Sequence, residues 1–277
     1  MQLPEYSIVI PTFGEKGLSL LKSLLPVLAY SCRLNHETIV VDDGSEAKVV
    51  EELDKLCLMN SALLLHDDSN NGFAKACNAG IMHSNGESVI LTNNDIVPIG
   101  NAFDELSDTV KLHGIGMASC KLLYPNNTIQ HAGVRWVNPA HIQVPEGEKP
   151  IKGHGWFDHI NRFAPRHDIT ACRMEFRLCS GALLVVNSEL FKAVGLLDER
   201  FGMACEDIDL NLRCLEAGLM ALYNGHIEAY HLEGATRGNT AESKAMHPEW
   251  NERDKRGLDF LFDKWDGVRW EMFEAGQ

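Results

Sequence analysis

Short apolar runs alternate with longer stretches of helical periodicity over the first hundred residues. The runs at 6–10, 38–41, 62–65 and 88–91 are rich in β-branched residues and have the length of buried strands. Between them, leucine, valine and alanine recur at helical spacing, and Pro26 is expected to kink the first of these helices. Strands that alternate with helices predict a parallel sheet with right-handed crossovers, which is an α/β fold.

The rest of the chain is less regular. Ser188 is predicted to cap a short helix, and residues 138–166, rich in Pro, Gly, His and aromatic side chains, are predicted to form a long loop. From residue 242 onward the chain is charged and is predicted to be helical. Other extended segments are predicted at 118–124, 129–136, 181–186, 220–223 and 227–230, and other helices at 101–113 and 206–217.

Polar residues follow the predicted strands of the first half. They are Pro11-Thr12, Asp42-Asp43-Gly44-Ser45 and Asn93-Asn94-Asp95. Parallel strands end at the same edge of a sheet, where open α/β sheets bind their ligands, so we predict a nucleotide-binding half. Taken alone, the Asp-Gly segment is about as typical of an ordinary turn as of a ligand site, and the Asn-Asp segment is more typical of a turn.

Three further segments carry candidate chemistry. Asn71-Gly72 opens a helix that carries Lys75, and helix N-termini favour anions, although a capped helix with a solvated lysine has the same pattern. Glu206-Asp207-Ile208-Asp209 offers a general base or ordinary dipole partners, and Asp207 and Asp209 should point to different sides of the helix. His231 follows a strand, and imidazole with a carboxylate suits Mn²⁺ or Mg²⁺.

Composition narrows the classes of function. The 277 residues carry a formal net charge of -14, which disfavours a broad surface for nucleic acid. The chain has neither GxGxxG after its first strand nor a P-loop motif, which disfavours ordinary dinucleotide-binding and P-loop enzymes. It shows no signal peptide and no run long enough to span a bilayer, and its eight cysteines are scattered singly. We therefore expect a reduced cytoplasmic protein.

Taken in order, these motifs resemble the family-two inverting glycosyltransferases of the GT-A fold, closest to rhamnosyltransferase-like enzymes of O-antigen or capsule synthesis. The resemblance covers residues 6–238 and rests on the ordered set of motifs. To those above it adds Lys121–Pro125, Ile129–Val134, Ser180-Gly181-Ala182, Leu197–Phe201 and Tyr230-His231. It implies one catalytic domain at 1–238, with a nucleotide-binding half at 1–100 and a metal and acceptor half at 101–238. A helical extension follows at 239–277.

The resemblance also implies roles for individual residues. Asp207 would be the catalytic base, and Asp95 and His231 would hold a divalent cation, Mn²⁺ or Mg²⁺. The implied nucleotide contacts are Pro11, Thr12, Glu15, Asp42, Asp43, Lys75, Asn78, Asn93, Asn94 and Arg237. The acceptor and donor-sugar side would include His131 with Gln130, Trp136, Trp156, Gly181 and Glu206. The chain departs from the family's DxD motif, because Asn93-Asn94-Asp95 has a single carboxylate, which predicts a weaker metal site.

The implied reaction is the transfer of a sugar from a UDP- or dTDP-sugar to a hydroxyl of a glycan or lipid-linked saccharide by a single displacement. Two other hypotheses stay open. The first is a non-catalytic nucleotide-sugar-binding protein of the same fold. The second is transfer to a modified DNA base, which would need a basic groove formed by Arg162, Arg166, Arg173 and Arg177. Peripheral contact with the inner face of a membrane is compatible with the sequence, and the oligomeric state is open.

Overall fold

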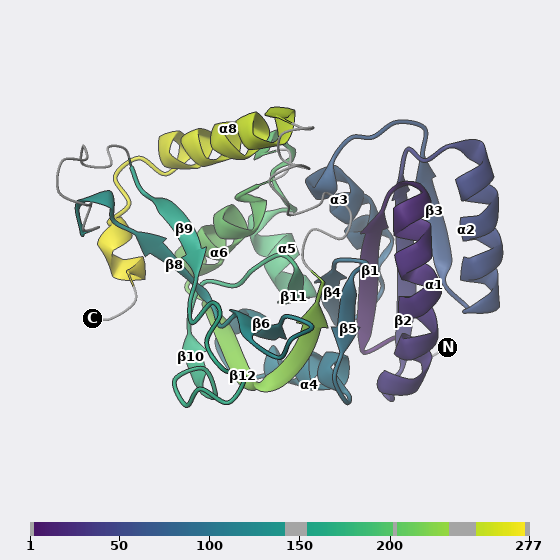
Figure 1. Ribbon diagram of the computed structural model, residues 1–277, viewed down its shortest axis with the longest axis horizontal. Helices are drawn as coiled ribbons and strands as arrows, with labels where there is room; N and C mark the ends of the chain where they lie inside the picture. Colours follow the sequence, from purple (N-terminus) through teal and green to yellow (C-terminus); the bar gives the residue numbers. More distant parts are fainter. Residues whose placement is uncertain (1–2, 142–153, 202–203, 233–247, 275–277) are drawn as a thin grey trace.

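A mixed ten-stranded sheet forms the centre of the molecule (Figure 1). The structure is a computed structural model that describes residues 3–141, 154–201, 204–232 and 248–274. Four parallel strands form one side of the sheet in the order β3-β2-β1-β4. They confirm the predicted parallel arrangement. Their bounds are β1 Tyr6–Thr12, β2 His36–Asp43, β3 Leu63–Asp67 and β4 Ser88–Thr92.

The other side of the sheet is mixed. Strand β11 runs antiparallel to both β4 and β6, β6 and β12 are parallel, and β10 lies at the edge. The sequence predicted two short strands where the single strand β12 lies, because a register shift between Asn224 and Glu228 interrupts the pattern. The bounds are β5 Ile96–Pro98, β6 Ile115–Leu123, β7 Ile129–His131, β10 Met174–Phe176, β11 Leu183–Asn187 and β12 Met220–His231.

Helices cover both faces of the sheet. One apolar cluster joins α1, α2 and α4 to one face, and a second joins α3, α5 and α6 to the other. The prediction that Ser188 caps α5 was wrong, because the Asn187 side chain accepts the hydrogen bond from the Glu189 N–H. The helices are α1 Gly14–Ser31, α2 Ala47–Met59, α3 Phe73–His83, α4 Ala102–Thr109, α5 Ser188–Val194 and α6 Glu206–Glu216.

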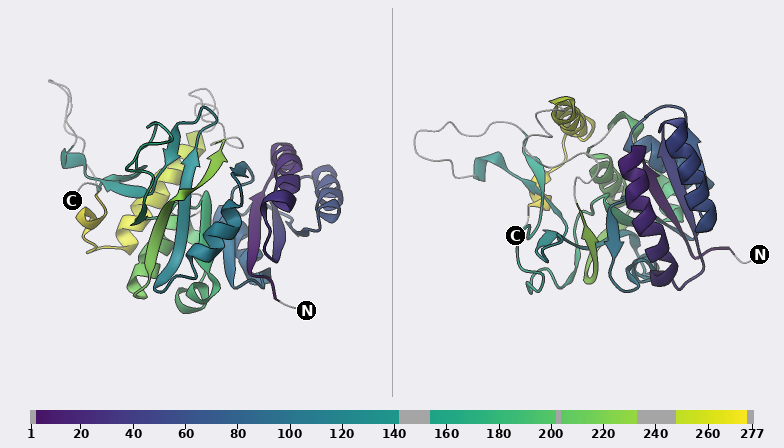
Figure 2. Two further views of the ribbon diagram at one scale, coloured as in Figure 1. Left: turned by 90° about the horizontal axis from the view of Figure 1, so that it is seen from below. Right: turned by 45° about the vertical axis from the view of Figure 1, so that its right-hand side comes forward.

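A small hairpin and the C-terminal helices pack against one another and against α6, on the side of the molecule away from β3 (Figure 2). The hairpin pairs β8 (Val134–Val137) with β9 (Trp156–His159). The predicted long loop was therefore wrong at 156–159, because all four residues of β9 are half-buried and give no alternating pattern. Helix α8 (Pro248–Lys264) confirms the predicted helical tail over those residues, whereas residues 242–247 of the prediction lie outside the described residues. Short 3-10 helices lie at η1 Pro139–His141, η2 Glu199–Phe201 and η3 Trp270–Phe273.

None of the helices among the described residues has the length and apolar character needed to cross a membrane.

Candidate active site

The polar residues that follow β1 and β4 meet at one edge of the sheet. Thr12 is the last residue of β1, and Asn94 lies two residues beyond β4, whose strand pairs with β1 in parallel register. The Asn94 side-chain amide donates a 3.0 Å hydrogen bond to the Thr12 hydroxyl, and both side chains are buried. Pro11, half-buried, is paired with Val41 of β2. The predicted edge is thus assembled by direct contacts between its motifs.

The two carboxylates at the end of β2 hold the loops around them. Asp43 accepts hydrogen bonds from the backbone N–H groups of Asn71, at 2.8 Å, and Gly72, at 2.9 Å, and so fixes the start of α3. Burial raises the pKa of Asp43, and these two N–H groups partly offset that rise. Gly44, with φ +86°, is needed here because a Cβ would lie 2.4 Å from the backbone of Ser69.

Asp42 has a partner that the sequence did not reveal. Its fully buried carboxylate lies 2.8 Å from Nδ1 of His66, at the neighbouring strand β3, and it also accepts from the backbone N–H of Ser45. Strand pairing places Asp42 opposite His66, and the sequence alone does not fix that register. The contact places an imidazole ring beside the buried carboxylate of Asp42.

Three other predicted nucleotide contacts lie on helices rather than at strand ends. Glu15 is exposed in the first turn of α1, and Lys75 lies 3.7 Å from Asp67. Asn78 is buried, and its amide exchanges hydrogen bonds with the backbone N–H and carbonyl of Leu197 at 3.0 and 2.9 Å. Asn78 therefore joins α3 to the segment before η2. Arg237 lies outside the described residues.

Asp95 and His231 are brought together, although 136 positions separate them in the chain. Strand pairing sets His231, the last residue of β12, opposite Ile96, and the Leu232 N–H donates to the Asp95 carbonyl at 3.2 Å. Oδ1 of Asp95 then lies 3.2 Å from Nε2 of His231, and both side chains are buried. Nδ2 of Asn93 lies 3.4 Å from the same ring nitrogen.

This pair fits a divalent cation. A carboxylate oxygen and an imidazole nitrogen are both ligands of Mn²⁺ and Mg²⁺. Adjacent ligands on an octahedral ion with bonds of about 2.1 Å lie roughly 3 Å apart, and the 3.2 Å separation of Oδ1 and Nε2 matches this. Within the described part of the chain, no group of three or more His, Cys, Asp or Glu side chains converges.

Asp207 lies in the first turn of α6, with a backbone cradle around its carboxylate. The N-cap residue of α6, Cys205, adopts the left-handed conformation with φ +73°. Oδ2 of Asp207 accepts from the Gly181 N–H at 2.8 Å, and Oδ1 from the Ile208 N–H at 2.8 Å. Burial raises the pKa of Asp207, and the two N–H groups only partly counter it. A carboxylate with a raised pKa is a stronger base than an exposed one.

One short segment joins Asp207 to the motif after β4. Gly181 donates to Asp207, and the carbonyl of the next residue, Ala182, accepts from the Asn93 N–H at 2.9 Å. A Cβ on Gly181 would lie 3.3 Å from Cβ of Asp207, so glycine permits this close approach. The candidate base and the candidate metal motif are therefore fixed to the same two residues.

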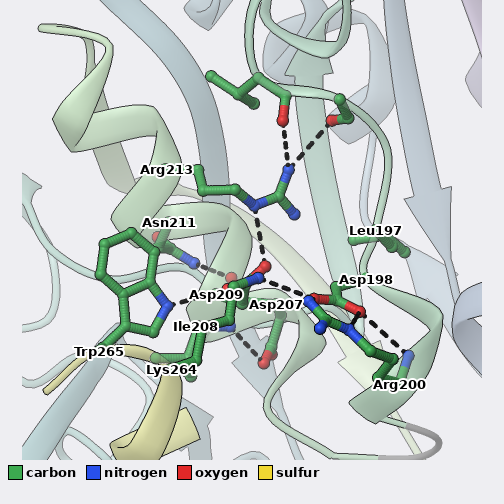
Figure 3. A network of polar contacts seen from close by, with 12 residues as sticks. Leu197, Asp198, Arg200, Asp207, Ile208, Asp209, Asn211, Arg213, Lys264 and Trp265 are labelled. Carbon is green, nitrogen blue, oxygen red and sulfur yellow. Dashed lines mark hydrogen bonds and ion pairs between the residues drawn. The ribbon is translucent and has the colours of Figure 1, made fainter.

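Asp209 points away from Asp207, as predicted from helical spacing. Its fully buried carboxylate lies 2.8 Å from Nε of Arg213, 2.6 Å from Nζ of Lys264 and 2.9 Å from Nε1 of Trp265 (Figure 3). Lys264 also reaches Asp198 at 2.8 Å. Asp209 is thus an anchor for the C-terminal helix α8.

The residues predicted for the acceptor and donor-sugar side are mostly buried. His131 is fully buried, with Nδ1 2.9 Å from Nδ1 of His159, and burial with the nearby cationic groups lowers its pKa well below the usual value. Trp136 donates from its indole to the His154 carbonyl inside the hairpin, and Trp156 is half-buried. Glu206 is buried in the first turn of α6.

The sequence matches the model of glycosyl transferase family 2 over residues 7–161, more than half of the chain. The chain belongs to this family. Protein y4gI of Sinorhizobium fredii is 32% identical over 269 residues, which are 95% of this glycosyltransferase and 28% of that protein. The O-antigen biosynthesis protein RfbC of Myxococcus xanthus is 27% identical over 241 residues, 84% of this chain and 18% of RfbC. The glycosyltransferase thus spans less than a third of either relative.

Solved glycosyltransferase structures share its fold. The mannosyltransferase PcManGT from Pyrobaculum calidifontis, in complex with GDP-Man and Mn²⁺, has a TM-score of 0.63 at 17% identity, covering 97% of this chain and 66% of that one. GalNAc-T7 with UDP, GalNAc and Mn²⁺ has a TM-score of 0.62 at 16% identity, covering 97% of this chain and 53% of its own. The predicted α/β glycosyltransferase fold is confirmed.

Proposed function

We propose that this glycosyltransferase moves a sugar from a nucleotide-diphospho-sugar to a hydroxyl of a glycan or lipid-linked saccharide, with inversion at the anomeric carbon. The observation that carries the proposal is the shared segment Gly181-Ala182, which holds Asp207 on one side and the backbone of Asn93 on the other. The proposed base and the proposed diphosphate site are therefore neighbours. This arrangement suits a displacement in which the acceptor hydroxyl attacks as the diphosphate leaves.

Asp207 is the proposed general base. It takes the proton of the acceptor hydroxyl as the oxygen attacks the anomeric carbon, on the face opposite the leaving diphosphate. Its cradle of two N–H groups fixes the carboxylate, and burial raises its pKa and so its strength as a base. A single displacement of this kind inverts the configuration and needs no covalent enzyme intermediate.

Asp95 and His231 are the proposed protein ligands of a divalent cation. When bound, the cation would stabilise the negative charge that develops on the diphosphate. Asp95 supplies the one carboxylate of the motif, and Asn93 contacts the ring of His231 from the first position of the motif. Two neighbours of the same fold were solved with Mn²⁺, which supports this assignment.

The nucleotide is proposed to bind over the ends of β1 and β2, where Pro11, Thr12, Asp42 and Asp43 lie. The neighbours' own ligands include GDP-Man and UDP, so more than one nucleotide occurs on this fold. The name of the RfbC relative supports a saccharide acceptor of the O-antigen type.

Titration calorimetry with UDP, dTDP and GDP, each with and without Mn²⁺, tests the nucleotide and cation sites. We expect one nucleotide to bind tightly only with Mn²⁺, and Asp95→Ala to lose that binding while the variant keeps its melting temperature. If none of the three diphosphates binds under either condition, the proposed transfer is refuted.

Hydrolysis of the donor sugar distinguishes the proposed transferase from a non-catalytic nucleotide-sugar-binding protein. A transferase should slowly hydrolyse its donor sugar in the absence of acceptor, and Asp207→Asn should abolish this hydrolysis while it leaves Mn²⁺-dependent nucleotide binding intact. Nucleotide binding without any hydrolysis or transfer by the wild-type chain would favour a binding protein instead.

The DNA-directed alternative finds less support in the contacts of its four arginines. Arg166 pairs with Glu228, and Arg177 with Glu175 and the Ala132 carbonyl. Arg162 donates to the Tyr124 hydroxyl, and Arg173 lies 3.8 Å from Glu175. All four arginine side chains thus already contact other groups of the protein, whereas a groove that binds DNA phosphates would need them to be available to the phosphates.

A further inference from the structure

Gln130 is a buried amide beside the candidate metal ligand His231. It lies in the middle of β7, is 2% exposed, and places Oε1 2.9 Å from Nδ1 of His231. Its neighbour His131 turns to the other side of the strand, toward Ser119 and His159. Gln130 thus reaches the ring from the side opposite Asp95.

The contact determines where the ring carries its proton. The amide oxygen of Gln130 faces the ring and only accepts hydrogen bonds, so in this orientation of the amide Nδ1 of His231 is the N–H that donates to Gln130. In the neutral ring, Nε2 is then an acceptor with its lone pair exposed. The amide nitrogen of Asn93, a donor, lies 3.4 Å from Nε2 and is consistent with the same assignment.

The Nε2–H tautomer of His231 would prevent the Asp95–His231 pair from binding a cation. With the proton on Nε2, the ring would donate directly to Oδ1 of Asp95, 3.2 Å away. That hydrogen bond would occupy one lone pair of the Asp95 carboxylate, and the protonated Nε2 would have no lone pair with which to bind a cation. Unrestrained histidine rings in water prefer the Nε2–H tautomer, so the restraint has to come from the protein.

We propose that Gln130 is a positioning residue, which holds His231 in the Nδ1–H tautomer and keeps Nε2 and Asp95 available to a divalent cation. This rests on the proposed function, because it assigns the metal to that pair. Gln130 touches neither the diphosphate nor the acceptor in this scheme, and it acts through the ring of His231 alone.

The tautomer can be measured without metal. Long-range ¹H–¹⁵N correlation spectra distinguish Nδ1–H from Nε2–H rings, and the signals of His231 are assigned by their loss in His231→Gln. At a pH where the ring is neutral, we expect the wild-type chain and Gln130→Glu, which keeps the acceptor, to show Nδ1–H. Gln130→Leu should shift His231 to Nε2–H. An unchanged Nδ1–H ring in Gln130→Leu would overturn the proposal.

Mn²⁺ affinity is the second readout, measured by electron paramagnetic resonance with the nucleoside diphosphate that binds the wild-type chain. Loss of a partner of this kind typically weakens metal binding by about 10–100-fold, and we expect this for Gln130→Leu, with Gln130→Glu restoring affinity. Ser119→Ala is the matched control, because it removes a buried polar group next to His131 and should change neither readout.

The outcomes separate the two proposals. Wild-type affinity in a correctly folded Gln130→Leu variant would overturn the role of Gln130 and leave the transferase proposal intact. If the wild-type chain binds no Mn²⁺ with any nucleotide, the proposed metal site fails, and the metal-free spectra still decide whether Gln130 sets the ring. A Gln130→Leu variant that does not fold is replaced by Gln130→Met, which is judged by the same criteria.

Discussion

Two carboxylates two positions apart in α6 have opposite surroundings. Among the described residues, Asp207 accepts hydrogen bonds from the backbone N–H groups of Gly181 and Ile208, and its pKa is raised by burial. Asp209 is surrounded by the cationic groups of Arg213 and Lys264 and by an indole N–H. The first environment suits a base that must gain a proton during turnover, and the second a permanent charge that holds the fold together.

Asp207→Asn should reduce transfer by about 10²–10⁴-fold, the range that a positioned base contributes. Nucleotide affinity should stay within a few-fold of wild type, because Asp207 does not lie at the ends of β1 and β2. Steady-state kinetics and calorimetry on the same preparation check both expectations. Nearly full activity in Asp207→Asn would remove Asp207 from the reaction.

The pH dependence of kcat/KM should report the raised pKa of Asp207. A general base works as the carboxylate, so activity should rise as pH rises through its pKa. Because burial raises that pKa, the acid limb should lie above the value of about 3.9 expected for an exposed Asp. Nucleotide affinity measured over the same pH range separates this limb from titration of the diphosphate. An acid limb at or below the ordinary Asp value would contradict the assignment.

At the scale of elements, α8 is attached to α6 and to the segment before η2 through the carboxylates of Asp209 and Asp198. Lys264 bridges the two, and Trp265 donates its indole N–H to Asp209 (Figure 3). Asp209 lies one turn before Arg213 and in the same helix as Asp207. The contacts of α8 therefore help to hold α6, the helix that carries the candidate base, in position.

Asp209→Asn should destabilise the chain by roughly 3–5 kcal/mol, the usual cost of leaving buried charges without their partner. Here Arg213 and Lys264 would each lose a buried counter-ion. Urea denaturation followed by circular dichroism measures the change. Asp207→Asn is the matched control, since it makes the same replacement at a carboxylate that pairs with no Lys or Arg side chain among the described residues. Equal stabilities of the two variants would show that the α8 anchor is energetically unimportant.

The strand ends and helix faces of the first half could be predicted from the sequence, because each follows from local periodicity. The opposite orientations of Asp207 and Asp209 could also be predicted, from helical spacing alone. The partners of these residues could not. The contact of Gln130 with His231 depends on how β7 and β12 lie against β6, and that of His66 with Asp42 on strand register. Such long-range contacts leave no periodic signal in one sequence.

At the scale of the whole molecule, the candidate site draws on both halves of one sheet. Thr12, Asp43 and Asp95 come from the first hundred residues, whereas Asp207 and His231 come from the second half. Strand β4 of the first half pairs with β11 of the second, and one sheet runs through both. The family match ends at residue 161, before the candidate base and the candidate histidine ligand. Because one sheet runs through both halves, the two halves should unfold as one cooperative unit.

The positions of the tryptophans allow that expectation to be tested. All five, at positions 136, 156, 250, 265 and 270, lie after the first half, in the second half or in the C-terminal extension, whereas the nucleotide is proposed to bind mainly over the first half. Thermal unfolding followed by tryptophan fluorescence and by far-ultraviolet circular dichroism should give the same midpoint.

The nucleotide with Mn²⁺ at about 100 times its Kd should stabilise the native state by about 2.7 kcal/mol. For a chain of this size, this should raise both midpoints by roughly 5–10 °C. The rise should vanish with EDTA and in Asp95→Ala. If the nucleotide shifted the dichroism transition and left the fluorescence transition in place, the halves would be separate units. The site would then be confined to the first half, because a ligand stabilises only the cooperative unit that binds it.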